Sequence, residues 1–307
     1  MPFPAQTRRR TALGSIAGIG VNRPSASTPL ARRVTGAEVT GVAFRVQAEQ
    51  GITTASLAAG AAQAALLAAG TSPNDLEMIL VGTTTPDVLW PSTACLVQSE
   101  LKLPMVGAFD LYAAETSFLA GLDIATRYVT AGARGVLLIG AESDNQLVDL
   151  PGQARSVHAR AAVAAVLTPA VDDCGILATA VGGAARPLLS SDGHDRMLLQ
   201  GLTEAAAECL EKAGLNLRDV DLVIADQAAP EIMRAWSRRH EMPQDRVLLE
   251  PERYGSLLGA APFILLYDTV QAGQLRDGMT VLVLGCGSGP VWAAACLRWN
   301  GARVRQC

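Results

Sequence analysis

Hydrophobic positions along the chain alternate between the period of a strand and the period of a helix. Residues 15–21 (SIAGIGV) form a short apolar run that ends at the turn NRPS, and this run predicts a first buried strand. Alternating strand and helix patterns are typical of a layered α/β fold. No apolar run approaches the ~18 to 20 residues that span a bilayer, so we expect no membrane segment.

Two stretches repeat one pattern without a gap, residues 57–87 and residues 201–231. Each begins with an alanine-rich helix, which stops at a glycine and is followed by a strand. Gly70 and Gly214 stand where a residue in the left-handed conformation ends a helix. The repeat predicts that one α/β unit has been duplicated within the chain.

A second pair of stretches corresponds in the same way, residues 127–143 and residues 268–288, with four extra residues in the later copy. We therefore expect two similar halves, residues 15–175 and residues 176–307. Residues 1–14 are expected to be a disordered arm in front of the first strand.

Composition narrows the function classes. Half of the residues are apolar, 18% are charged, and the net charge of −4 gives no basic surface for nucleic acid. The six cysteines form no C-x-x-C pair, which favours reduced thiols and a cytoplasmic protein. The three histidines lack metal-ligand spacing, so we expect neither a metal ion nor another cofactor.

Six motifs, taken in order, resemble those of the ketosynthase III family of the thiolase superfamily and cover nearly the whole chain. They are IAGIGVNRP (16–24), TTTPDVLWPSTACLVQ (83–98), SDG (191–193), DQAAPE (226–231), RYGSLLGAA (253–261) and GCGSGPVW (285–292). The resemblance implies a thiolase-like fold, a duplicated α-β-α-β-α sandwich of five layers. It also implies a place in fatty acid or polyketide biosynthesis, where the family joins an acyl group to malonyl on a carrier protein.

The resemblance identifies three catalytic positions, and all three carry other residues here. The family's nucleophilic cysteine corresponds to Glu115, in the stretch FDLYAAETSF. The family's histidine and asparagine, which bind the enolate oxygen during decarboxylation, correspond to Asp226 and Ser256. The internal repeat supports this alignment, because Glu115 and Ser256 occupy equivalent positions in the two halves.

Two carboxylates facing an enolate would repel it, so we expect no condensation by the family mechanism. The first hypothesis is a pseudo-ketosynthase that supports an active homologue. A second is an acyltransferase, hydrolase or decarboxylase that acts on acyl thioesters, with Glu115 as base or nucleophile. In a third interpretation, Glu115 only caps its helix, where the helix dipole favours a negative side chain.

Further binding positions follow from the resemblance. Gly287, Ser288 and Gly289 correspond to the glycine loop that supplies a backbone N–H to the oxyanion hole. Trp90 corresponds to a residue that reaches into the acyl pocket of the partner subunit. The predicted assembly is a homodimer, or a heterodimer with a ketosynthase III homologue.

Carrier-protein docking is less well defined by the sequence. The family's docking arginine corresponds to Glu231, which reverses the charge, while Arg234, Arg238 and Arg239 lie on the same predicted helix and could replace it. An acyl carrier protein or a coenzyme A thioester therefore stays an open possibility as a partner. A solvated helix face would explain the three arginines equally well.

Overall fold

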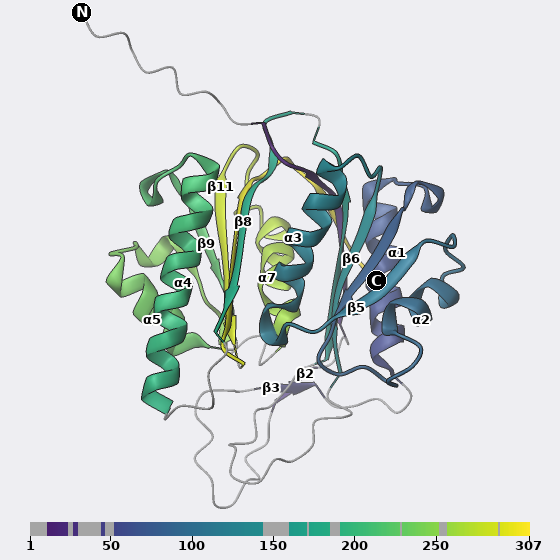
Figure 1. The fold of residues 1–307 in the computed structure, drawn as a ribbon, viewed down its shortest axis with the longest axis horizontal. Helices are drawn as coiled ribbons and strands as arrows, with labels where there is room; N and C mark the ends of the chain where they lie inside the picture. Colours follow the sequence, from purple (N-terminus) through teal and green to yellow (C-terminus); the bar gives the residue numbers. More distant parts are fainter. Residues whose placement is uncertain are drawn as a thin grey trace, which may run out of the picture.

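The computed structural model describes residues 11–23, 27–29, 44–46, 52–143, 160–170, 172–184, 191–227, 229–251, 257–287 and 289–307. These residues form five layers, in which two sheets alternate with three layers of helices (Figure 1). The predicted α-β-α-β-α sandwich is therefore confirmed. A disordered arm was expected over residues 1–14. Residues 1–10 of it lie outside the described residues.

The first sheet has six strands in the order β13-β1-β7-β6-β4-β5. Their bounds are β1 (Ser15–Asn22), β4 (Met78–Gly82), β5 (Gly107–Leu111), β6 (Val136–Glu142), β7 (Ala161–Thr168) and β13 (Arg303–Gln306). Strands β5, β4 and β6 run parallel, whereas β7 is antiparallel to both of its neighbours. Strand β5 is the last in the order, so one of its edges has no neighbouring strand in this sheet.

The second sheet has five strands in the order β10-β9-β11-β12-β8. Their bounds are β8 (Gly175–Gly183), β9 (Leu222–Ala225), β10 (Val247–Leu248), β11 (Thr280–Gly287) and β12 (Val291–Arg298). Strands β10, β9 and β11 are parallel, and β12 turns back antiparallel to β11. A small separate sheet pairs β2 (Ser27–Pro29) with β3 (Phe44–Val46).

Six α-helices form the three helical layers of the described chain. Helices α1 (Thr54–Ala69) and α2 (Thr93–Glu100) cover the first sheet, α4 (Ser191–Ala213) and α5 (Pro230–Arg239) cover the second, and α3 (Ser117–Thr130) and α7 (Ala261–Gln271) lie between the sheets. Short 3-10 turns are η1 (Pro73–Asp75), η2 (Ala114–Thr116), η4 (Leu217–Asp219), η5 (Gln244–Arg246) and η6 (Leu258–Ala260). No helix of the described residues is both long and apolar enough to cross a membrane.

The predicted repeat is present in the structure. Helix α1 ends at Gly70 with φ 64° and α4 ends before Gly214 with φ 69°, the left-handed values that favour glycine. Each helix is followed by a 3-10 turn and then by a central strand, β4 or β9. The division into halves at residue 175 stays a prediction. Strand β13, from the end of the chain, pairs with β1 of the first sheet.

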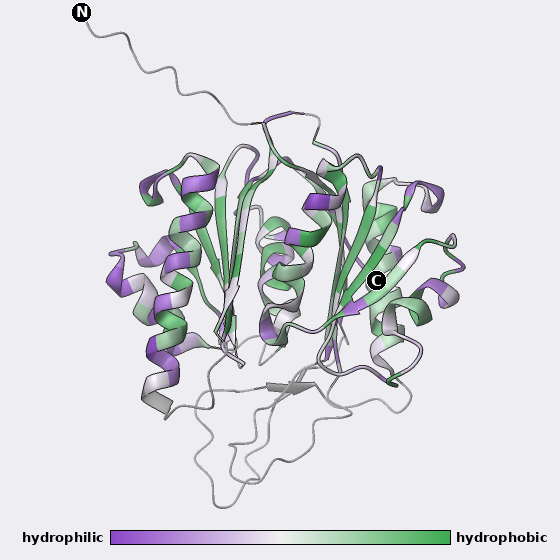
Figure 2. Cartoon of the chain, in the orientation of Figure 1, coloured by the Kyte–Doolittle hydropathy of each residue, from purple (hydrophilic) through white to green (hydrophobic). Residues whose placement is uncertain are grey.

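Three apolar clusters hold the layers together, one between the sheets and one under each outer helical layer. Figure 2 shows hydrophobic residues along the strands of the two sheets and many polar residues on the outer helices α4 and α5. The middle layer is packed closely, because a Cβ on Gly82 of β4 would lie 2.9 Å from the Cβ of Ser117 at the start of α3. A glycine on the sheet thus lets the first turn of α3 approach it.

Candidate active site

The candidate site lies where the carboxyl ends of both sets of parallel strands face the N-terminal end of α3, at the lower edge of the sheets in Figure 1. Glu115 follows β5, Glu142 is the last residue of β6, Asp226 directly follows β9, and Gly287 ends β11. Such edges commonly hold binding sites, because loops and helix N-termini meet there.

Glu115 lies on η2, the turn that leads from β5 into α3. Ala114 just before it has φ 47°, a conformation that costs energy for a residue with a Cβ. The half-buried Glu115 side chain lies against β11, since a Cβ on Gly287 would be 2.6 Å from Glu115 Cβ and 2.5 Å from Cδ. Glycine at position 287 therefore makes the room that Glu115 occupies.

The capping interpretation of Glu115 stays a prediction. The N-cap residue of α3 is Thr116, directly after Glu115, and the Thr116 side chain makes no capping hydrogen bond. The Glu115 carboxylate instead lies beside the opposite sheet, at Gly287. Its position near the helix N-terminus still favours the negative charge.

Asp226 directly follows β9, the strand that pairs with β11. Its side chain is buried, and its backbone N–H donates to Leu284 O of β11 at 2.9 Å. Burial, together with the negative charges of Asp226 and Glu115, raises the pKa of the Cys286 thiol well above its usual range. The charges of both carboxylates therefore act on one residue of β11, while the predicted closeness of Glu115 to Asp226 stays a prediction.

Glu142 is a third carboxyl group of this site, and the sequence did not single it out. It is 1% exposed and accepts hydrogen bonds from Thr84 N–H at 3.2 Å, Thr84 Oγ1 at 2.8 Å and Thr85 Oγ1 at 3.1 Å. Burial raises the pKa of Glu142 to about 8 against the opposing effect of these donors, and the charge of Glu115 adds to the rise. Burial therefore favours the neutral form of Glu142.

The remaining predicted site residues are placed only in part. Ser256 and Ser288 lie outside the described residues. Gly287 is the last residue of β11, and Gly289 beyond it has φ 90°. The oxyanion role of the loop therefore stays a prediction.

Trp90 lies on the surface of the chain. Its side chain is 89% exposed, as is that of its neighbour Leu89 at 87%. On α5, Arg234, Arg238 and Arg239 are all exposed, and Arg234 forms an ion pair with Glu231 of the same helix. Glu231, which corresponds to the docking arginine of the family, thus forms an ion pair with one of the three arginines.

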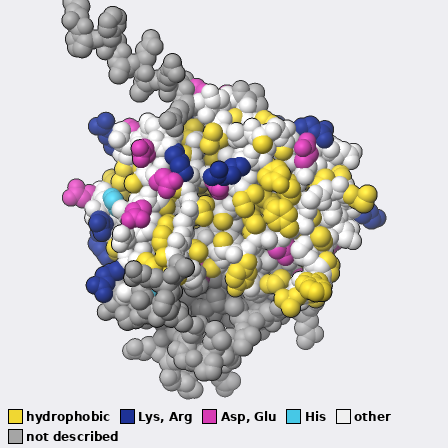
Figure 3. Space-filling model, viewed as in Figure 1, with side chains coloured by type: hydrophobic (Ala, Val, Ile, Leu, Met, Phe, Trp, Pro, Cys, Tyr) yellow, Lys and Arg dark blue, Asp and Glu magenta, His cyan; other side chains and the backbone are white. Residues whose placement is uncertain are grey.

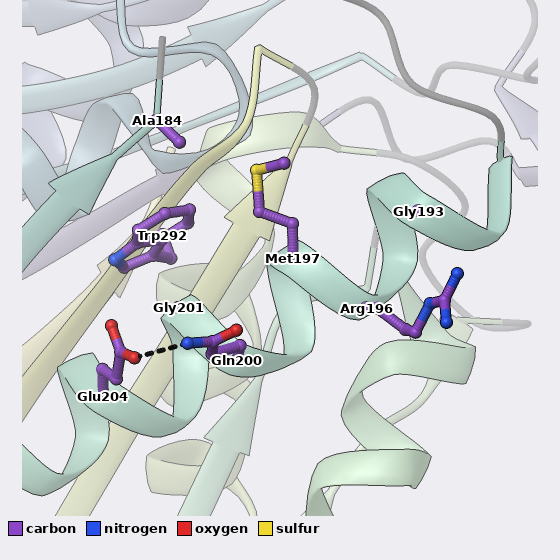
Figure 4. Close-up of a pocket in the computed structure, with 8 residues that line it drawn as sticks. All are labelled: Ala184, Gly193, Arg196, Met197, Gln200, Gly201, Glu204 and Trp292. Carbon is purple, nitrogen blue, oxygen red and sulfur yellow. Dashed lines mark hydrogen bonds between the residues drawn. The ribbon is translucent and has the colours of Figure 1, made fainter. Parts of the chain in front are cut away.

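A groove of about 470 Å³ lies on the outer side of the second sheet, between α4 and the ends of β8 and β12 (Figure 4). The Trp292 ring lies against Gly201 of α4 and Gly182 of β8, and Gln200 Nε2 donates to Glu204 at 2.9 Å along α4. The described residues that line it include none of the predicted site residues. Among the described residues, no cluster of three or more histidine, cysteine or acidic side chains is arranged to hold a metal ion.

Comparison with protein families gives the same family as the sequence motifs. Residues 109–185 match the family described as 3-oxoacyl-[acyl-carrier-protein (ACP)] synthase III, and residues 210–299 match its C-terminal domain. The beta-ketoacyl-[acyl-carrier-protein] synthase III of Aquifex aeolicus is 36% identical over 269 residues, which covers 83% of this chain and 86% of the relative. The enzyme of the same description from Bacillus pumilus is 32% identical over 275 residues, covering 85% and 88%.

Solved structures agree with these matches. The crystal structure of 3-oxoacyl-[acyl-carrier-protein] synthase III from Aquifex aeolicus VF5 superposes with a TM-score of 0.85 at 31% identity, over 93% of this chain and 100% of that one. The priming beta-ketosynthase of the R1128 polyketide pathway, at 24% identity and a TM-score of 0.81, has the same fold over 97% of this chain and 100% of its own. The chain is a thiolase-fold protein. It belongs to the 3-oxoacyl-[acyl-carrier-protein] synthase III, or ketosynthase III, family, as the motifs predicted.

Proposed function

We propose that this chain is a non-condensing ketosynthase III that pairs with a second chain of its family. The observation that carries the proposal is the set of carboxyl groups, Glu115, Asp226 and Glu142, that meets at the N-terminal end of α3. Condensation by the family mechanism passes through an anionic enolate, which needs hydrogen-bond donors around its oxygen. Carboxylates at the nucleophile and histidine positions oppose that charge.

The described cysteines offer no substitute nucleophile at this site. Attack on a thioester requires a thiolate, and burial raises the pKa of Cys286, the thiol affected by Glu115 and Asp226, far above neutral pH. Burial also raises the pKa of Cys209 and Cys296, which lie under the outer layer of the second sheet. These three thiols are expected to stay protonated and unreactive.

The direct test is the intact mass of the protein after incubation with acetyl-CoA or an acetylated carrier protein. The expected result is an unchanged mass, because Glu115 is a poor acceptor from a thioester. Glu115→Cys is the matched variant, and an acyl adduct on it alone would show that the thioester reaches the turn and that the missing thiol prevents transfer. A stoichiometric adduct on the wild-type protein that disappears in Glu115→Gln would falsify the non-condensing proposal.

One observation favours the alternative, an acyltransferase, hydrolase or decarboxylase of acyl thioesters. Burial raises the pKa of Glu142 to about 8, and Glu142 lies close enough to Glu115 for the charge of Glu115 to add to the rise. A carboxyl group with a raised pKa can serve as a general acid or base. Release of free coenzyme A that is lost in both Glu115→Gln and Glu142→Gln would support this alternative.

The pairing surface that we propose is the open edge of the first sheet. Strand β5 is the terminal strand, and large apolar side chains next to it are exposed: Leu89 87%, Trp90 89%, Met105 101% and Tyr112 80%. Figure 3 shows hydrophobic side chains gathered on this face, over α3 and the neighbouring strands. A patch of this kind marks an association site, and a strand edge pairs readily with another strand. We infer a cytoplasmic dimer.

A carrier protein is a further expected partner, by the resemblance to the family. Arg238 and Arg239 are exposed near the end of α5 and would face an acidic carrier surface, while Arg234 is engaged by Glu231. Charge attraction of this type is screened by salt, so any carrier binding is expected to weaken as salt is raised.

A further inference from the structure

Another groove, of about 550 Å³, lies in the outer helical layer of the second sheet, between α4 and α5 (Figure 1). We call it the α4–α5 groove. The aliphatic residues of its wall are Ala206, Ala207, Leu210, Leu215 and Leu217. Helix α4 leads through η4 into the start of β9, whereas Asp226 follows the end of β9. The groove therefore lies at the edge of the sheet opposite to the candidate active site.

Two aromatic side chains from the end of α5 complete the wall of the groove. Trp236 is 1% exposed, and His240, the C-cap residue of α5, is half-buried. The centroids of the two rings lie 4.8 Å apart. Trp236 Nε1 and His240 Nε2 are both buried, and neither has a hydrogen-bond partner among the described residues. An indole N–H can only donate, so leaving it without an acceptor costs free energy that a bound group would recover.

The charges around the groove favour a neutral ligand. Glu211 lines the groove, and the carboxyl ends of α4 and α5 lie beside it, where the helix dipole is negative, so an anion is disfavoured. A cationic ammonium group has no lone pair that could accept from the Trp236 N–H. Burial and the positive charge of Arg239 lower the pKa of His240, which favours the neutral imidazole. Its Nε2 accepts a hydrogen bond when Nδ1 carries the proton.

We propose that the α4–α5 groove binds a neutral alcohol or phenol with an apolar body, whose hydroxyl group accepts from Trp236 Nε1–H and donates to His240 Nε2. A single hydroxyl group supplies the acceptor and the donor that the two rings need, without a charge. The aliphatic wall holds the apolar body. Both ring nitrogens are covered in the free chain, so the half-buried His240 side chain turns to admit the ligand. The site is separate from the carboxyl groups of the proposed function and does not depend on them.

The experiment titrates the full chain with p-propylphenol and follows the indole N–H signals of its 4 tryptophans by NMR. Trp236→Phe removes one of these signals and thereby assigns it. The expected result is a saturable shift of the Trp236 signal. Propylbenzene, which has the same body without the hydroxyl group, should bind about tenfold more weakly, because its complex lacks both hydrogen bonds. The anion p-propylbenzoate should also bind more weakly than the phenol.

Two variants test the wall of the groove. His240→Phe keeps an aromatic ring and removes the acceptor, so it should weaken the binding of p-propylphenol and leave the binding of propylbenzene unchanged. Ala207 is exposed on α4 and lines the groove, so the larger side chain of Ala207→Leu should block both probes. Trp299→Phe is the matched control: Trp299 is 3% exposed in the apolar cluster between the sheets, and its loss should leave both affinities unchanged.

Three results would overturn the proposal. The first is a Trp236 signal that does not shift up to the solubility limit of p-propylphenol. The second is equal affinity for p-propylphenol and propylbenzene, since the hydroxyl group would then make no bond. The third is tighter binding of p-propylbenzoate, which would reverse the assigned charge class. If Trp236→Phe or His240→Phe does not fold, calorimetry with the three probes on the wild-type chain gives the same test.

Discussion

At the scale of single residues, Glu142 combines full burial with an ionisable group in a way that makes the protein's stability depend on pH. Its carboxyl group is held by Thr84 and Thr85, whose donors stabilise the charged form, but the loss of hydration outweighs them and raises the pKa to about 8. A raised folded-state pKa means that the group stabilises the fold while protonated. That contribution is complete below about pH 4.5 and is lost as the pH rises through about 8.

The free energy of unfolding of the wild-type protein is therefore expected to fall between pH 5 and pH 9 by a few kcal/mol, at about 1.4 kcal/mol for each pH unit between the folded and unfolded pKa values. Glu142→Gln should remove this fall, because glutamine stays neutral and keeps an oxygen for the two threonines. Urea unfolding at pH 5 and at pH 9 measures this difference in the free energy of unfolding. Glu77→Gln, at an exposed carboxylate paired with Arg134, is the control that should keep the wild-type fall. Equal stability of the wild type at both pH values would contradict the raised pKa of Glu142.

At the scale of secondary-structure elements, the helix ends were predictable because they depend on local chemistry. Gly70 and Gly214 are needed wherever a helix closes with a left-handed residue, and the repeat marks both positions. The position of Glu115 on the turn before α3 was predictable from the order of motifs. The burial of Glu142 was not, because it depends on Thr84 and Thr85 from the end of β4, which meet it only after the sheet forms. The hydrogen bonds that Asp87 accepts from the start of α1, and Asp110 from the start of α2, depend in the same way on contacts between distant segments.

The two helix ends supply a matched pair of variants. A Cβ added at Gly70 would touch nothing within 4 Å, so Gly70→Ala tests backbone conformation alone. The expected cost is about 1 kcal/mol, because alanine at φ 64° is strained. Gly214→Ala, at φ 69° in the equivalent position of the repeat, should cost a similar amount. Thermal unfolding of both variants checks this, and a neutral or stabilising result at either site would show that the turn tolerates a Cβ there.

At the scale of the whole molecule, the first sheet ends in β13 at one edge and in β5 at the other. Neither strand has a further neighbour in the described sheet, and β5 is the edge next to the turn that carries Glu115. Trp90, Met105 and Tyr112 are exposed, and under the proposed function the carboxylates of the site prevent the family's condensation. A protein with these two properties is best explained by what it contributes to a neighbouring chain, and the open edge is where it would do so.

Co-expression with an active ketosynthase III homologue is therefore expected to give a 1:1 complex, with an interface on the order of 2,000 Å² or more. Size-exclusion chromatography with light scattering measures the stoichiometry. Because Trp90 is exposed and belongs to the proposed pairing surface, Trp90→Ala should change the acyl-chain preference of the homologue and leave its nucleophile reactive. Leu67→Ala is the control, since Leu67 is also exposed, at 56%, but lies on α1 in the outer helical layer. A homodimer that ignores every homologue and itself turns over an acyl thioester would instead favour the acid–base enzyme with Glu115 and Glu142 as its catalytic pair.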